Sequence, residues 1–225
     1  MSHENQIKIV EGDEAKKGLD DRALIHFVNR VNKLEVQDTV GEQCHEIATR
    51  IHQSLGEEER KRALIDSIDP AFDPIEHMKD LRQNGQIAIA KDGDRTVGMA
   101  GFERCGTDPK SGRDVYEVRR IGVRKEDEKR GIGGQLHRTI FERVRVIDPQ
   151  ALILVEAWDQ VIMNQCKKMK YKECDVYDGL VRKGYREDRA RALIPWYQEK
   201  GYKFFVYDSS KAKASDTSTE EGGSE

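Results

Sequence analysis

The sequence predicts an α/β fold in which a mixed, mostly antiparallel central sheet is flanked by helices. Three strand-like runs follow one another over residues 86–90, 95–104 and 114–123, and the turns between them are typical of hairpins. A glycine-containing segment then opens an amphipathic helix over residues 130–147. The uninterrupted apolar run at 151–155 is typical of a buried central strand. Consecutive antiparallel strands, a helix and a buried strand together define this fold class.

The other elements follow from hydrophobic spacing. Residues 7–10 alternate enough for a short opening strand, and apolar residues recur at helical spacing between about 21 and 82. A helix over 189–200 ends at Gly201, where glycine is a common helix stop. A last strand is expected over 202–207.

The length of 225 residues fits one large domain or two small ones. We expect one domain over residues 1–208. Within it, residues 159–186 are basic and contain tyrosines, and we expect them to form an insertion between the fifth strand and the last helix. Residues 209–225 contain no large apolar side chain, so they cannot bury enough surface to offset the entropy of ordering. We therefore expect a disordered tail there.

Composition excludes some classes of protein. Hydrophobic residues make up 36% of the chain, which is enough for a sizeable core. Charged residues also make up 36%, but the net charge is only −3, so no global field steers the protein toward nucleic acid or an anionic membrane. The first residues lack the basic and apolar regions of a signal peptide, so we expect none, and no apolar run is long enough for a membrane span. The four cysteines show no metal-binding spacing. We expect an intracellular, cytoplasmic chain with reduced thiols and no metal.

The densest functional signal is a glycine loop that follows the strand ending at Val123. After a charged turn, Gly131, Gly133 and Gly134 open the next helix. The N-terminus of a helix presents unpaired amides and a positive dipole end, and this arrangement favours binding of an anion, usually phosphate. Lys129, Arg130 and Glu128 stand just before the first glycine, and the two basic residues add positive charge at the rim.

Two common phosphate-binding motifs do not fit this loop. A P-loop places Lys and Ser or Thr after its last glycine, but Gly133 is followed by Gly134 and Gln135. A dinucleotide fingerprint needs a third Gly or Ala three residues after Gly133, where Leu136 stands.

The loop resembles that of the GNAT superfamily, the acyl-CoA-dependent N-acetyltransferases. Its coenzyme A loop has the pattern Gln/Arg-x-x-Gly-x-Gly/Ala, eight residues beyond a valine of the fourth strand. Gly131-Ile132-Gly133 fits with Val123 at that distance, while Glu128 occupies the usual Gln/Arg position. Members also end in a helix with a tyrosine four residues before a Gly-aromatic pair, which Tyr197 and Gly201-Tyr202 match.

The resemblance implies a GNAT fold and an enzyme that moves an acetyl group from acetyl-CoA to a primary amine. The acceptor would be a small molecule or a peptide lysine, attacking directly in a ternary complex. The implied coenzyme-binding residues are Ile121, Val123, Lys129, Arg130, Gly131, Ile132, Gly133 and Gly134.

The same resemblance implies two catalytic residues. Glu117 stands where some members carry a general base, and Tyr197 where many carry the acid that protonates the leaving thiolate. By the two-residue period of a strand, Glu117 would share a face with Arg119, Ile121 and Val123. Phe102 and Trp158 are candidates for the wall of the acyl site.

Two other functions remain open. The chain could be a non-catalytic acyl-CoA-binding or interaction module that has kept the fold. Alternatively, the basic insertion could bind nucleic acid through phosphates and stacking, although nucleic acid is the less favoured partner; it could also form a substrate lid or hold the 3′-phosphate of coenzyme A. Its basic and aromatic residues are Lys167, Lys168, Lys170, Lys172, Arg182, Lys183, Arg186, Tyr171, Tyr177 and Tyr185. We expect no membrane partner, and either a monomer or a homodimer.

Overall fold

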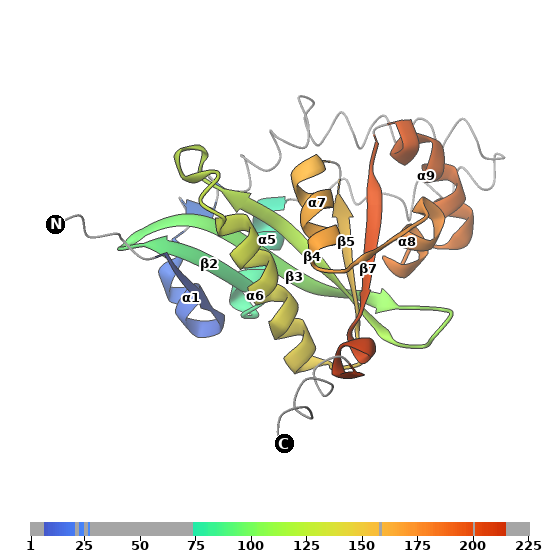
Figure 1. Cartoon of the computed structure of the whole chain (residues 1–225), viewed down its shortest axis with the longest axis horizontal. Helices are drawn as coiled ribbons and strands as arrows, with labels where there is room; N and C mark the ends of the chain where they lie inside the picture. Colours follow the sequence, from blue (N-terminus) through green and yellow to red (C-terminus); the bar gives the residue numbers. More distant parts are fainter. Residues whose placement is uncertain are drawn as a thin grey trace, which may run out of the picture.

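The computed structural model of the chain describes residues 7–20, 23–24, 27, 74–157, 159–199 and 201–214. The helices expected between residues 28 and 73 lie outside the described residues, as does Trp158. A seven-stranded sheet dominates the described part (Figure 1). Its order is β1-β2-β3-β4-β5-β7-β6, and every pair of neighbours is antiparallel except β4 and β5. The mixed, mostly antiparallel sheet predicted from the sequence is therefore confirmed.

The elements of the first half follow the predicted order. The bounds are β1 (Lys8–Glu11), α1 (Gly12–Gly18), α5 (Pro74–Gln83), β2 (Ile87–Asp92), β3 (Arg95–Thr107), β4 (Asp114–Val123) and a short 3₁₀ helix, η1 (Lys125–Asp127).

The second half contains more regular structure than the sequence predicts. Its elements are α6 (Ile132–Ile147), β5 (Leu152–Ala157), α7 (Gln160–Lys168), β6 (Lys172–Cys174), α8 (Val176–Arg182), α9 (Glu187–Glu199), β7 (Lys203–Asp208) and the 3₁₀ helix η2 (Ser209–Ala214). The segment expected as an insertion, 159–186, thus forms α7, β6 and α8, and all three pack on the sheet. Because η2 continues directly from β7, helical structure extends six residues beyond the expected start of the tail.

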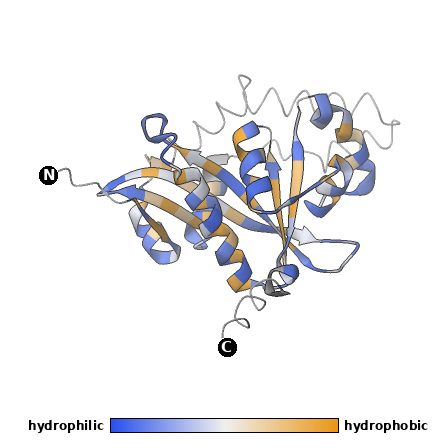
Figure 2. Ribbon diagram, viewed as in Figure 1, coloured by the Kyte–Doolittle hydropathy of each residue, from blue (hydrophilic) through white to orange (hydrophobic). Residues whose placement is uncertain are grey.

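Alternation along the strands gives the sheet two buried faces. In β5, Ile153 and Val155 pack with α6 and α7, while Leu152 and Leu154 pack with α8 and α9. Figure 2 shows the hydrophobic residues concentrated in the strands of the sheet. The helices are consequently divided between the faces: α6 and α7 lie on one, and α1, α5, α8 and α9 on the other.

Helix α6 crosses the front of the sheet in Figure 1. Its buried residues recur at helical spacing, as Ile132, Leu136, Ile140 and Val144 show. Close packing at its first turn depends on Gly98 in β3, because a Cβ there would lie 3.0 Å from side-chain atoms of Ile132 and Leu136. The glycine lets the start of α6 approach the sheet closely.

Candidate active site

The start of α6 has the geometry predicted for the glycine loop. Gly131 is the N-cap residue, with φ of 77°, a left-handed conformation that glycine adopts without strain. Having no side chain, it cannot accept hydrogen bonds from the first amides of α6, and the first turn carries no acidic residue. These amides and the helix dipole remain available to an anion.

A groove of about 760 Å³ runs beside this helix start, between α6 and α7. Gly131, Gly134 and Arg138 line it from the α6 side, and Gln165 and Lys168 from α7. Gln165 Nε2 donates to the carbonyl of Gly133 across the groove at 3.3 Å. Glycine amides and two cations along one groove fit a ligand that carries phosphates.

Sequence reasoning missed α7 and the groove residues it supplies. Asp159 is the N-cap of α7, and its carboxylate accepts from the amides of Val161 and Ile162 at 2.7 and 3.0 Å. Met163 and Cys166 are buried three residues apart on the face toward the sheet. An aspartate followed by this apolar spacing is a helix-start signal that was present in the sequence.

The predicted coenzyme residues do not all face the groove. Arg130 NH1 lies 2.6 Å from Asp127 Oδ1 and 2.9 Å from Asp92 Oδ2, so two carboxylates already compensate its charge. Lys129 is exposed, and Ile132 is buried in the core, so only its backbone amide can contribute.

A β-bulge in β4 separates Glu117 from Ile121 and Val123. Met99 pairs with Gly122 and Gly101 with Arg119, so β4 has one extra residue there, and Arg120 has a positive φ of 48°. Ile121 and Val123 consequently pack toward α6, where a Cβ on Gly133 would meet both. The prediction that they share a face with Glu117 and Arg119 is wrong, because the strand period assumed no bulge.

Glu117 stands where β4 and β5 part. The two strands pair over only three positions, Val115 to Glu117 against Leu152 to Leu154. Beyond that point β4 continues to Val123 and β5 to Ala157 without pairing with one another. The backbone groups of β4 beyond Glu117, on the edge toward β5, therefore form no ladder hydrogen bonds with β5.

The side chain of Glu117 is 2% exposed and lies in a cluster of charged groups. Its Oε1 is 3.2 Å from Nζ of Lys183, which also forms an ion pair with Glu156 of β5. Its Oε2 is 3.0 Å from a guanidinium nitrogen of Arg119 but receives no hydrogen bond from the described residues. One oxygen of this buried carboxylate thus keeps its accepting capacity.

The cluster continues across β3. Glu103 is directly opposite Glu117 in the sheet, and Arg119 forms ion pairs with both carboxylates. His77 of α5 contacts Glu103 through its Nε2 at 2.8 Å. Burial raises the pKa of Glu103, but the contacts with His77 and Arg119 outweigh it and lower the pKa to about 2. Sequence reasoning identified only Glu117 and its neighbour Arg119 among these residues, because the other partners come from four separate parts of the chain: β3, α5, β5 and the residue after α8.

Opposing effects act on the pKa of Glu117. Burial raises it, the positive charges of Arg119 and Lys183 lower it, and the carboxylates of Glu156 and Glu103 raise it again; the net direction is upward. Burial alone would lower the pKa of Lys183, but Glu117 and Glu156 hold it well above its usual value. The carboxylate is thus more basic than an exposed glutamate.

Tyr197 of α9 belongs to the same face of the sheet. It is buried against Tyr202 and Phe204, with ring centroids 5.3 and 5.5 Å away. Burial raises its pKa well above the usual value, the charge of Glu156 raises it further, and Lys183 lowers it. Phe102, in contrast, is buried in the core beneath α6, next to Tyr116.

Among the described residues, no group of three His, Cys, Asp or Glu side chains is placed to hold a metal ion. Likewise, no helix in that part of the chain is long and apolar enough to cross a membrane.

A mixed sheet that separates between β4 and β5, beside a helix opened by glycines, is the GNAT fold. The model of the acetyltransferase (GNAT) family matches residues 42–158, just over half of the chain. The protein therefore belongs to the GNAT family of acyl-CoA-dependent acetyltransferases.

Two solved structures agree with this fold. An N-acetyltransferase from Staphylococcus aureus Mu50 is 14% identical with a TM-score of 0.50, and the match covers 91% of this chain and 99% of that one. A protein of Acinetobacter baylyi assigned as an acetyltransferase is 10% identical with a TM-score of 0.51, covering 92% and 94%. In a third match, to a Pyrococcus horikoshii protein assigned as an acetyltransferase, this chain spans only 47% of the other, at 17% identity, 77% coverage of this chain and a TM-score of 0.41. No curated protein sequence matches the chain.

Proposed function

We propose that the protein transfers the acetyl group of acetyl-CoA to a primary amine by direct attack, with Glu117 as the general base. The observation that carries this proposal is the buried Glu117 Oε2, which receives no hydrogen bond from the described residues and stands where β4 and β5 part. A free alkylamine has a pKa near 10.4 and is mostly protonated at neutral pH, so a base must remove its proton before attack.

The two substrates would bind on opposite faces of the sheet. The groove beside α6 would hold the phosphates of the coenzyme, through the amides of Gly131 to Gly134 together with Arg138 and Lys168. The carboxylates of Glu117 and Glu156 lie on the face covered by α8 and α9. An amine bound there would approach the acyl group through the point where the strands separate.

The unpaired edge of β4 supports the placing of the acyl carrier. Backbone groups of residues 118–123 that would otherwise pair with β5 can hydrogen-bond to the amides of a pantetheine arm, as an added strand would. Val123, at the end of this edge, would contribute through its backbone and not through its side chain, which packs toward α6. Ile121 would act in the same way.

In the reaction, acetyl-CoA supplies an acetyl thioester. The amine nitrogen forms a bond to the acetyl carbon and the carbon–sulfur bond breaks; the nitrogen loses one further proton as the amide forms, and the thiolate gains one. Glu117 accepts the proton that the ammonium gives up before attack. Tyr197 is the proposed donor to the thiolate, because its hydroxyl is affected by the charges of Glu156, Lys183 and Glu117 and so belongs to the same buried cluster.

The test compares Glu117→Gln with Tyr197→Phe over a range of pH, measuring thiol release from acetyl-CoA with a panel of amines, polyamines and lysine peptides. Loss of the base should lower kcat/KM by about 10²–10⁴-fold at neutral pH, because that is the usual contribution of general base catalysis. Higher pH should partly restore the rate, since the free amine then becomes abundant. For Tyr197→Phe we expect a smaller loss without such rescue, because a thiol leaves readily with a pKa near 8.5.

Coenzyme binding is the control for both variants, since neither residue lines the groove beside α6. Calorimetry should give the same affinity for coenzyme A in both. If the protein binds coenzyme A but acetylates no amine of the panel, a non-catalytic acyl-CoA-binding module would be favoured. Losses below about threefold in both variants, independent of pH, would remove these two residues from the mechanism and leave proximity as the source of rate.

A further inference from the structure

A second pocket, of about 440 Å³, lies at the opposite end of β5 from Glu156. Leu152 at the start of β5 and Val206 and Tyr207 near the end of β7 give it an apolar wall. It shares no lining residue with the groove beside α6. Its volume is within the range of small-molecule sites, and such sites combine apolar walls with a few placed polar groups.

The rim of this pocket is strongly basic. Five cations face it from five different segments, against the two carboxylates of Asp108 and Asp208, a surplus of three positive charges. Lys170 and Lys172 form no ion pair with any residue that the structure describes. The cations are Arg113, Lys170, Lys172, Arg182 and Lys211.

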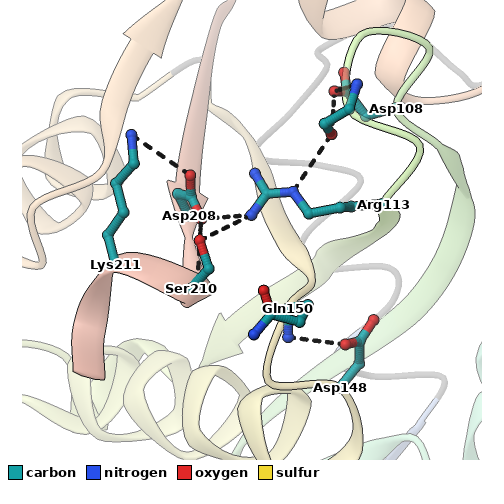
Figure 3. A network of polar contacts seen from close by, with 8 residues as sticks. Asp108, Arg113, Asp148, Gln150, Asp208, Ser210 and Lys211 are labelled. Carbon is teal, nitrogen blue, oxygen red and sulfur yellow. Dashed lines mark hydrogen bonds and ion pairs between the residues drawn. The ribbon is translucent and has the colours of Figure 1, made fainter. Parts of the chain in front are cut away.

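The two carboxylates hold the two arginines in place. Arg182 donates from Nε to Asp108 Oδ1 at 3.0 Å, and its side chain is 14% exposed. Figure 3 shows Arg113 between Asp208 and Ser210 on one side and the loop of Asp108 on the other. A guanidinium fixed in this way loses little further entropy when it binds an anion.

Arg182 also has an unsatisfied donor. Its NH1 nitrogen is buried and forms no hydrogen bond within the described residues. A buried donor without a partner costs free energy, and an acceptor oxygen that reached it would remove that cost. The donor belongs to an arginine that lines the pocket together with two lysines that form no ion pair within the described residues, and this combination points to an anionic ligand.

We propose that this pocket binds the phosphate group of a small phosphorylated molecule. The phosphate oxygens accept from Arg182 and Lys172, with Lys170 and Lys211 at the rim, and the organic part rests on Leu152, Val206 and Tyr207. A phosphate matches a surplus of three positive charges better than a single carboxylate does, because it carries up to two negative charges and several acceptor oxygens.

The structure favours a small molecule over nucleic acid. The basic residues of 159–186 do not form a continuous strip: Lys183 is buried between Glu117 and Glu156, and Arg186 pairs with Asp188. Lys168 lines the other groove. Only Lys170, Lys172 and Arg182 of that segment meet at this pocket.

The test measures binding of inorganic phosphate and of phenyl phosphate by calorimetry, with benzoate as the carboxylate comparison and coenzyme A at saturation to fill the groove beside α6. We expect phenyl phosphate to bind at least about tenfold more tightly than inorganic phosphate, because of the apolar wall. Equal affinities for the two would assign the site to free phosphate. Benzoate should bind more weakly than either.

Two variants and a matched control locate the site. Lys172→Met and Arg182→Met should each weaken phenyl phosphate binding by about tenfold or more, the loss expected for a charge-assisted hydrogen bond. Replacing Arg182 could disturb its partner Asp108. Lys172 is exposed, so Lys172→Met tests the site without that complication. Lys167→Met removes the same charge from an exposed position on α7 outside the pocket and should change affinity by less than about twofold.

Three results would overturn the proposal. They are no saturable binding at millimolar phenyl phosphate, an equal loss in Lys167→Met, and displacement of the probe by coenzyme A. A single-stranded oligonucleotide that binds with steep salt dependence and needs Lys167 and Lys168 as much as Lys172 would replace it with a nucleic-acid surface.

Discussion

Lys183, the residue after α8, places its ammonium nitrogen 3.2 Å from Oε1 of Glu117 in the middle of β4. Both side chains are nearly inaccessible to water, at 10% and 2% exposure. Burial disfavours the charged carboxylate, and Lys183 opposes that effect together with Arg119. The balance decides whether Glu117 is ionised, and therefore able to take a proton, at neutral pH.

Removing Lys183 should move the acid side of the pH profile. In Lys183→Met the pKa of Glu117 rises further, because burial is then opposed by Arg119 alone. A base acts only when deprotonated, so the acid limb of kcat/KM should shift upward by about one to two pH units. Profiles of kcat/KM between pH 5 and 9 measure this shift.

Lys183→Arg is the matched control, since it keeps the charge and should leave the acid limb near its original position. Breaking a buried ion pair also costs stability, by about 3–5 kcal/mol, so folding of both variants is checked by thermal denaturation. An acid limb that stays in place in folded Lys183→Met would mean that Lys183 does not control the ionisation of Glu117.

Gly134 offers a direct test of the groove beside α6. A Cβ at this position would lie 3.5 Å from Gln165 Nε2, an ordinary contact, so Gly134→Ala should bind coenzyme A within a few-fold of the original protein. Gly134→Glu places a carboxylate in the groove lined by Gln165 and Lys168, and like charges next to phosphates should lower affinity by about 100-fold or more. Calorimetry with coenzyme A distinguishes the two.

Gly133 is less suitable for this test, because its missing Cβ faces Ile121 and Val123 of β4. A side chain larger than alanine there would disturb the packing of α6 as well as the site. Unchanged coenzyme affinity in Gly134→Glu would mean that the coenzyme does not occupy this groove.

The sequence predicted those strands and helices whose signals lie within a few neighbouring residues. The strands at 86–90, 95–104 and 114–123 and the helix that starts beside Gly131 appear close to their predicted bounds, because their alternation, turns and glycines act over a few residues. The bulge at Arg120 was missed, since it is defined by pairing with β3 and the sequence carries no glycine there.

The catalytic cluster shows the same limit. Glu117 could be proposed from its place before the loop. The other members of the cluster, Lys183, Glu156 and Glu103, lie 66, 39 and 14 residues away from it in the chain. No spacing rule covers such distances, because they depend on how α8 and β5 pack on the sheet. Glu156 did leave a signal: it is a carboxylate near the end of an otherwise apolar strand.

The end of the chain should contribute to stability only as far as η2. Ser209 donates its amide to the carbonyl of Ala151 at 3.2 Å, and Ser210 accepts from Arg113 while donating to Asp208 (Figure 3). Deleting residues 209–225 should cost about 1–2 kcal/mol, or roughly 2–8 °C in Tm for a domain of this size. Deleting only residues 215–225 should change Tm by less than about 2 °C, because that segment has no apolar side chain to bury. Equal losses of several degrees in both truncations would show that residues 215–225 dock on the domain.

Stability should also depend on pH through His137, which is fully buried on α6. Its Nε2 contacts the hydroxyl of Tyr171 at 3.1 Å, and its Nδ1 has no partner within the described residues. Burial lowers the pKa of His137 from 6.5 to about 4, and the nearby side chain of Gln165 opposes this only in part. In the unfolded chain the imidazole keeps its ordinary pKa, so between about pH 6.5 and 4 the unfolded state binds the extra proton.

The stability that His137 provides is therefore fully present above pH 6.5 and is lost as the pH falls toward 4. The fall in the pKa of His137 from 6.5 to about 4 corresponds to about 3 kcal/mol. His137→Gln removes the titrating group and keeps a polar partner for Tyr171. The free energy of unfolding is measured by urea titration at pH 7.5, 6, 5 and 4. Between the highest and the lowest pH we expect it to fall by about 3 kcal/mol more in the wild-type protein than in His137→Gln. Parallel curves for the two proteins would mean that His137 is not held neutral by burial.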